Sequence, residues 1–155
     1  MLHIILITIH ACVAIVSFIF GFIVLRPPSK QGVSPLYRVF IIALWLMVLS
    51  LIAVVCVDWI QLNMASRIVF GTLTLFAIYI GWRGWRASYQ FRTRHGAWKK
   101  KYIDDIGFTL IALFDGFAII FVLDLGAPVW AAVTTGVLAV FVGRFSLARF
   151  KKQVL

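Results

Sequence analysis

The hydrophobic residues of this chain are gathered into long blocks that are separated by short polar stretches. The blocks follow neither a helical stripe nor the alternation of a strand, and they are long enough to cross roughly 30 Å of hydrocarbon as helices. A backbone in lipid has to satisfy its hydrogen bonds internally, and the alternating pattern of a membrane β-barrel is missing. The pattern therefore predicts an all-α, polytopic integral membrane protein, folded as a helical bundle.

Five transmembrane helices are predicted within a single transmembrane domain, residues 1–155. Pro27 and Pro28 end the first hydrophobic block, because proline cannot continue a helix. The stretch DLGAP separates the last two blocks, which together are far too long for one crossing. The predicted spans are 2–25, 38–57, 67–82, 106–123 and 129–145, with a basic loop at 83–105 and a basic tail at 146–155.

Composition agrees with this class. Hydrophobic residues make up 63% of the chain, and the mean hydropathy is +1.04, whereas soluble domains are about half apolar. Cys12 and Cys56 both fall inside hydrophobic blocks and form no closely spaced pair. We interpret them as buried thiols that take part in neither a disulfide nor a metal site.

The charges predict how the chain is threaded. Fifteen Lys and Arg residues outnumber five Asp residues, for a net charge of +10. In a soluble protein this excess would indicate nucleic acid, but here the basic residues lie between and after the hydrophobic blocks. Arg67 alone falls on the side that also carries Asp58 and Asp124. The positive-inside rule then places the N-terminus outside and the C-terminus inside a bacterial inner membrane, with no nucleic-acid partner.

Asp115 is the sharpest polar feature, because it lies near the centre of the fourth span. A charged carboxylate there costs several kcal/mol unless it is paired, protonated or solvated. Helices one and four run in opposite directions, so residues at matching depths pair in order. We therefore expect His10 to face Asp115, and His3 to face Asp124 near the outer surface.

Three hypotheses account for this set. Buried polar pairs hold transmembrane helices together, at about 1 kcal/mol each. A proton or ion relay is the second hypothesis, since imidazole titrates near neutrality. The third is a haem or metal site, with His3 and His10 as haem ligands or His3, Asp58 and Asp124 around a divalent ion. Two His on one helix cannot supply both axial ligands of one haem, so haem b would need a His from a second chain or a sixth ligand other than His.

Two further patterns concern packing and lipid contact. Small residues at spacings of four, three and four let another helix approach the fifth span closely, and we expect packing within the bundle rather than contact with a partner subunit. These residues are Ala132, Gly136, Ala139 and Gly143. The basic loop mixes cations with aromatic residues, which suits contact with anionic lipid headgroups or equally with an acidic partner. Gly96 is expected to interrupt any helix there. The candidate contacts of the loop are Arg86, Arg92, Arg94, Trp98, Lys99, Lys100 and Lys101.

The first fifty residues resemble a family of small polytopic bacterial membrane proteins of uncharacterised activity whose first helix begins with a His. The resemblance lies in LHIILITIHACVAIVSFIFG, in the linker KQG followed by YR, and in VFIIALWLMVLSLI. Family members carry a His before that Arg, whereas this chain has Tyr37, which counts against any metal or haem role that the resemblance implies.

No catalytic motif accompanies these features: the sequence has no Gly-x-Ser-x-Gly, no phosphate-binding glycine loop and no Glu. Asp104 and Asp105 are expected to cap the fourth helix rather than to hold a catalytic metal. The leading hypothesis is a non-catalytic accessory or scaffold subunit of a membrane assembly, working with other subunits or as a homo-oligomer. The alternative is a haem-binding redox or proton-handling module that uses His3, His10 and Asp115.

Overall fold

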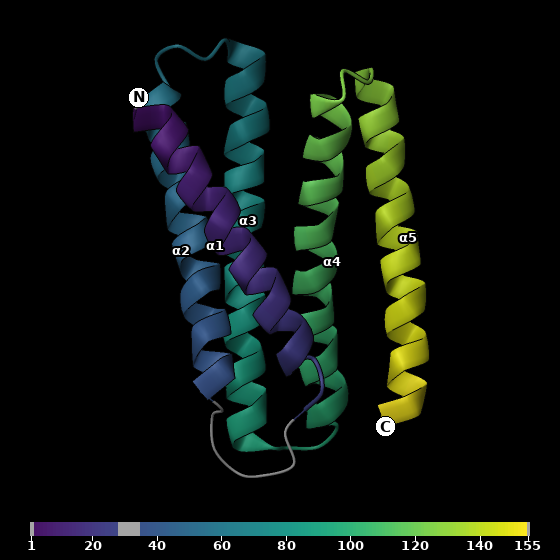
Figure 1. Cartoon of the computed structure of the whole chain (residues 1–155). Coiled ribbons are helices and arrows are strands. Elements are labelled where there is room, and N and C mark those ends of the chain that lie inside the picture. Colours follow the sequence, from purple (N-terminus) through teal and green to yellow (C-terminus); the bar gives the residue numbers. More distant parts are fainter. Residues whose placement is uncertain (1, 28–34, 155) are drawn as a thin grey trace.

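The computed structural model describes residues 2–27 and 35–154, and it confirms the predicted five-helix bundle. The helices are α1 (Leu2–Val24), α2 (Pro35–Asp58), α3 (Met64–Thr93), α4 (Trp98–Asp124) and α5 (Val129–Val154). Each is long and apolar enough to cross a membrane. The two ends of the chain lie at opposite ends of the bundle, as an odd number of crossings requires (Figure 1).

Four of the helices stand in a row, and the first is laid across them. Helices α2, α3, α4 and α5 contact one another in chain order, while α1 packs along α2 and reaches α4 with its second half (Figure 1). In the described part of the chain, α5 touches α4 alone. The bundle is therefore thickest where α1, α2, α3 and α4 meet, and α5 is an outlying helix.

The tightest packing lies toward the end of the bundle that carries the C-terminus. Phe40 and Leu44 of α2 and Ile103 and Ile106 of α4 are fully buried there. Gly84 of α3 makes this possible, because a Cβ at this position would meet Leu44 at 2.5 Å. Elsewhere large apolar side chains cover the outer surface of the helices, which is the expected arrangement against lipid.

The connections follow from local backbone chemistry. Gly126, with a φ of 75°, ends α4, and the amide of Ala127 donates to the carbonyl of Val122 at 3.3 Å, the reach of a Schellman cap. Pro128 then precedes α5. Between α3 and α4, Arg94 and Gly96 both adopt positive φ angles, so the chain reverses within a few residues.

The predicted extents of the third and fourth spans were too short. The segment 83–105 was expected to be a loop, yet α3 continues to Thr93 and α4 begins at Trp98, with the break at Gly96. A span predicted from hydropathy stops where basic residues begin. The helix itself continues until its backbone groups form hydrogen bonds outside the helix. At about 1.5 Å per residue, α3 extends for about 45 Å, well beyond the hydrocarbon thickness.

Candidate functional site

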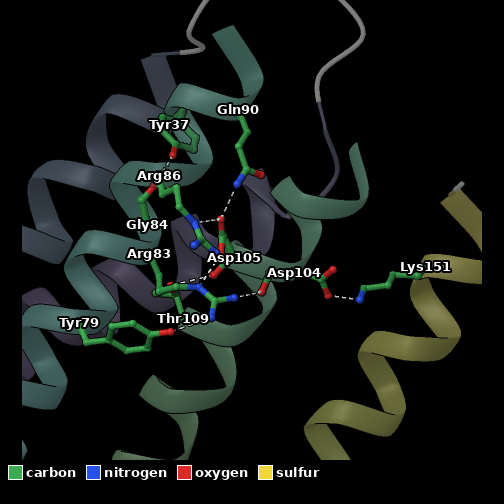
Figure 2. A network of polar contacts seen from close by, with 10 residues as sticks. All are labelled: Tyr37, Tyr79, Arg83, Gly84, Arg86, Gln90, Asp104, Asp105, Thr109 and Lys151. Carbon is green, nitrogen blue, oxygen red and sulfur yellow. Dashed lines mark hydrogen bonds and ion pairs between the residues drawn. The ribbon is translucent and has the colours of Figure 1, made fainter. Parts of the chain in front are cut away.

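Asp105 of α4 is the centre of a buried ion-pair network at the end of the bundle that carries the C-terminus (Figure 2). Its carboxylate has no exposed surface. Arg86 of α3 binds it with two nitrogens, Nε to Oδ2 at 2.9 Å and Nη2 to Oδ1 at 2.6 Å. Gln90 donates from Nε2 to Oδ2 at 3.0 Å, and Arg83 forms a second ion pair with Oδ1.

Arg83 also reaches beyond this carboxylate. Its Nη2 donates to the backbone carbonyl of Asp104 at 3.3 Å, and its Nη1 lies 3.2 Å from the hydroxyl of Tyr79. Its guanidinium carbon lies 4.5 Å from the ring centroid of Phe108, at cation–π distance. Two arginines therefore share one buried carboxylate, and the network of α3 and α4 carries one excess positive charge.

Asp104 contacts α5, the helix on the other side of α4 from α3. Consecutive helical residues point in directions about 100° apart, so Asp105 faces α3 while Asp104 pairs with Lys151 of α5 (Figure 2). The expected capping role of the two residues was wrong, because α4 begins at Trp98 and both lie beyond its first turn. They connect α4 to the helices on either side of it.

Two tyrosines complete the connections at this end. The hydroxyl of Tyr37 in α2 donates to the carbonyl of Gly84 in α3 at 2.6 Å. The hydroxyl of Tyr102 in α4 donates to the carbonyl of Val24 at the end of α1, at 2.7 Å. Together with the aspartate pairs, these bonds join all five helices near one membrane surface.

The predicted pairing of His10 with Asp115 is not formed. His10 Nδ1 lies 3.0 Å from the carbonyl of Met47 and 3.1 Å from the hydroxyl of Ser50, so its imidazole bonds α1 to α2. Asp115 faces α5 instead: a Cβ added to Gly136 would lie 3.0 Å from its Oδ1. The side chain of His3 lies outside the described residues, so its pairing with Asp124 stays a prediction.

Asp115 lines a groove that is bounded by residues of α3, α4 and α5. We call this cavity of about 400 Å³ the α3–α5 groove. Asp115 Oδ1 is buried and has no hydrogen-bond partner in the described part of the chain. The ionisable residues that line the groove are Arg83, Asp104, Asp115, Arg144 and Lys151.

The predicted lipid contacts divide into two groups. Arg86 turns inward to Asp105, whereas Arg92 and Lys99 to Lys101 lie exposed at the surface. Arg94 stacks on Phe91 and Trp98, with its guanidinium carbon 5.0 and 5.1 Å from the two ring centroids. Arg92 and Lys99 to Lys101 are therefore accessible to lipid headgroups, whereas Arg86 is held by Asp105.

The small residues of α5 face α4. Ala132 and Ala139 are buried, and a Cβ on Gly143 would lie 2.6 Å from Ile111. Gly136 meets Asp115 and Ile119 in the same way. Their small size lets α5 approach α4 closely within the chain.

The other polar candidates are scattered. Asp58 and Asp124 lie at the ends of α2 and α4. Among the side chains that the structure describes, which do not include that of His3, no group of three His, Cys or acidic residues is placed to hold a metal ion. Cys12 and Cys56 are free thiols, but both are exposed on the bundle, contrary to the buried placement expected from the sequence.

Sequence reasoning missed the partners of Asp105. Arg83, Arg86 and Gln90 are spaced three and four residues apart, which puts them on one face of a helix. This signal was present but was hidden by assigning the segment to a loop. Comparisons of the chain with protein-family models, curated proteins and solved structures found no match.

Proposed function

We propose that the bundle lies in a bacterial cytoplasmic membrane with its N-terminus outside and its C-terminus inside. Of the fourteen Lys and Arg residues that the structure describes, thirteen fall toward the end of the bundle that carries the C-terminus. The exception, Arg67, lies near the opposite end, where it donates to the backbone carbonyl of Trp59 at 3.1 Å. This difference in basic residues between the two ends of the bundle supports the proposed orientation, because basic residues favour the cytoplasmic side.

Within that membrane, the function we propose is that of a non-catalytic accessory or scaffold subunit of a larger assembly. The observation that carries the proposal is the use of the ionisable side chains within the spans. His10 bonds to α2, Arg83 and Arg86 to Asp105, and Lys151 to Asp104. These groups make contacts between neighbouring helices of the bundle, which is the arrangement of a rigid frame.

Purification from the native membrane in a mild detergent tests this proposal. The sample is read together by mass spectrometry, light scattering and visible absorption. We expect a colourless protein with stoichiometric membrane subunits, or a homo-oligomer of fixed size. A Soret band would contradict the scaffold proposal in favour of haem, and a monomer without partners would contradict the assembly.

A second function is favoured by Asp115 alone. An unpartnered carboxyl group in a membrane span marks proton or ion pathways, and this one lies in a groove rather than in the packed core. Proton handling predicts that purified protein in proteoliposomes moves protons, as a pH-sensitive dye reports. Asp115→Asn should abolish that movement, and proteoliposomes of the natural protein that stay as tight as empty ones would reject this function.

A further inference from the structure

The charges that line the α3–α5 groove are unbalanced. Arg83 and Lys151 are held by ion pairs with Asp105 and Asp104. Arg144 is exposed on α5 and forms no ion pair with any residue that the structure describes. Counting the five ionisable groups of the lining, three cations face two carboxylates, so the groove is net positive even with Asp115 ionised.

Arg144 also lies deeper than Lys151, the other cation that α5 contributes to the groove. It precedes Lys151 by seven residues on α5, which places its Cα about 10 Å further into the membrane. A guanidinium below the headgroups is costly unless it reaches the interface or an anion reaches it. Arginine binds phosphate through two nitrogens, so phosphate is the anion that best matches it.

The remaining surface of the groove is apolar. Ile111 and Ala112 of α4 form its floor and Val140 of α5 part of its wall, while Phe76 of α3 lies partly exposed at its rim. A volume of about 400 Å³ is within the range of cavities that bind small molecules, about 300 to 1,000 Å³. A ligand that complements both the cationic and the apolar surface of the groove carries an anionic head and a hydrocarbon tail.

We propose that the α3–α5 groove binds one anionic phospholipid of the surrounding leaflet. Its phosphate lies on Arg144, at the side of the groove nearer Lys151, and one acyl chain follows Ile111, Ala112 and Val140. The net positive lining selects against a zwitterionic lipid, whose own cation would meet Arg83 and Lys151. The proposal requires only that the helices span a bilayer, and it holds whichever way the chain is threaded.

The test measures the lipid that stays with the protein purified in a mild detergent. The purified protein is incubated with phosphatidylglycerol, phosphatidylcholine or inorganic phosphate, passed through gel filtration, and its bound lipid is quantified by mass spectrometry. Thermal unfolding is followed in the same samples. We expect about one phosphatidylglycerol per chain and a raised unfolding midpoint, with no effect of phosphatidylcholine or inorganic phosphate.

Variants locate the site. Arg144→Gln should lower phosphatidylglycerol retention roughly tenfold, as expected for losing charge-assisted hydrogen bonds. Arg149→Gln is the matched control, because Arg149 lies on the same helix, stacks on Phe145 and does not line the groove. Ala148→Phe keeps Arg144 but fills the groove from an exposed position, so it should also release the lipid.

Several results would overturn the proposal. Equal retention by the natural protein and Arg144→Gln would remove Arg144 from the site. An equal loss in Arg149→Gln would reduce the effect to general surface charge. Retention of phosphatidylcholine to the same degree would remove the charge selectivity, and an equal midpoint shift with inorganic phosphate would replace the lipid by a free anion.

Discussion

Replacing Asp105 with Asn should destabilise the bundle more than replacing its neighbour Asp104. Asn keeps the shape of the side chain but removes the charge that two arginines share in a fully buried position. Arg83, whose side chain is only 15% exposed, would then lie in the interior without a counter-ion. The same change at Asp104 leaves Lys151 near a partly exposed position, where water or headgroups can replace the lost partner.

The magnitudes follow from burial. Removing one partner of a buried ion pair typically costs about 3 to 5 kcal/mol, because the remaining charge is stranded. An exposed pair contributes about 0 to 1 kcal/mol. Because the Asp104 carboxylate is 38% exposed and that of Asp105 fully buried, we expect a loss near 3 kcal/mol for Asp105→Asn and below about 1 kcal/mol for Asp104→Asn.

The free energy of unfolding is measured in mixed micelles by titration with a denaturing detergent. A double-mutant cycle adds Arg86→Gln, and the double variant should lose less than the sum of the two single losses. Equal destabilisation by Asp105→Asn and Asp104→Asn, or strict additivity with Arg86→Gln, would refute the claim that a buried charge network holds α3 to α4.

Three further changes are informative in the same assay. Tyr102→Phe should cost about 1 kcal/mol, because the carbonyl of Val24 loses its buried donor; no change would mean that this bond is unimportant in the bundle. Gly143→Ala should destabilise the α4–α5 contact by about 1 to 3 kcal/mol, whereas Gly116→Ala, which meets open space, should not; the reverse order would contradict the packing. Asp115→Asn should leave the unfolding free energy within about 0.5 kcal/mol, since no ion pair is lost, and a large loss would reveal a partner.

The sequence was sufficient to predict the number of helices and their order along the chain. Hydropathy blocks, the proline pair after Arg26 and the glycine at 126 gave the five crossings and their turns. Each of these signals acts locally, through the length of an apolar run or the backbone freedom of one residue, so no tertiary information was needed.

The sequence did not predict which face of each helix points inward or which neighbouring helix that face contacts. His10 and Asp115 lie at depths that allow a pair, yet His10 bonds to Met47 and Ser50 because α1 packs along α2. Depth is set by position in the span, whereas the facing neighbour is set by side-chain packing over the whole bundle. In lipid both faces of a helix are apolar, so hydropathy carries little information about which face is inside.

Labelling of single cysteines tests the orientation of the bundle most directly. Cys12 and Cys56 are replaced by Ala, and a cysteine is introduced either at Gln61, between α2 and α3, or at His95, between α3 and α4; both positions are exposed. A membrane-impermeant maleimide should label the Gln61→Cys variant in intact spheroplasts and the His95→Cys variant only after lysis. Labelling of His95→Cys in intact spheroplasts, with Gln61→Cys protected, would contradict the proposed threading, and labelling of both would contradict a bilayer-spanning α3.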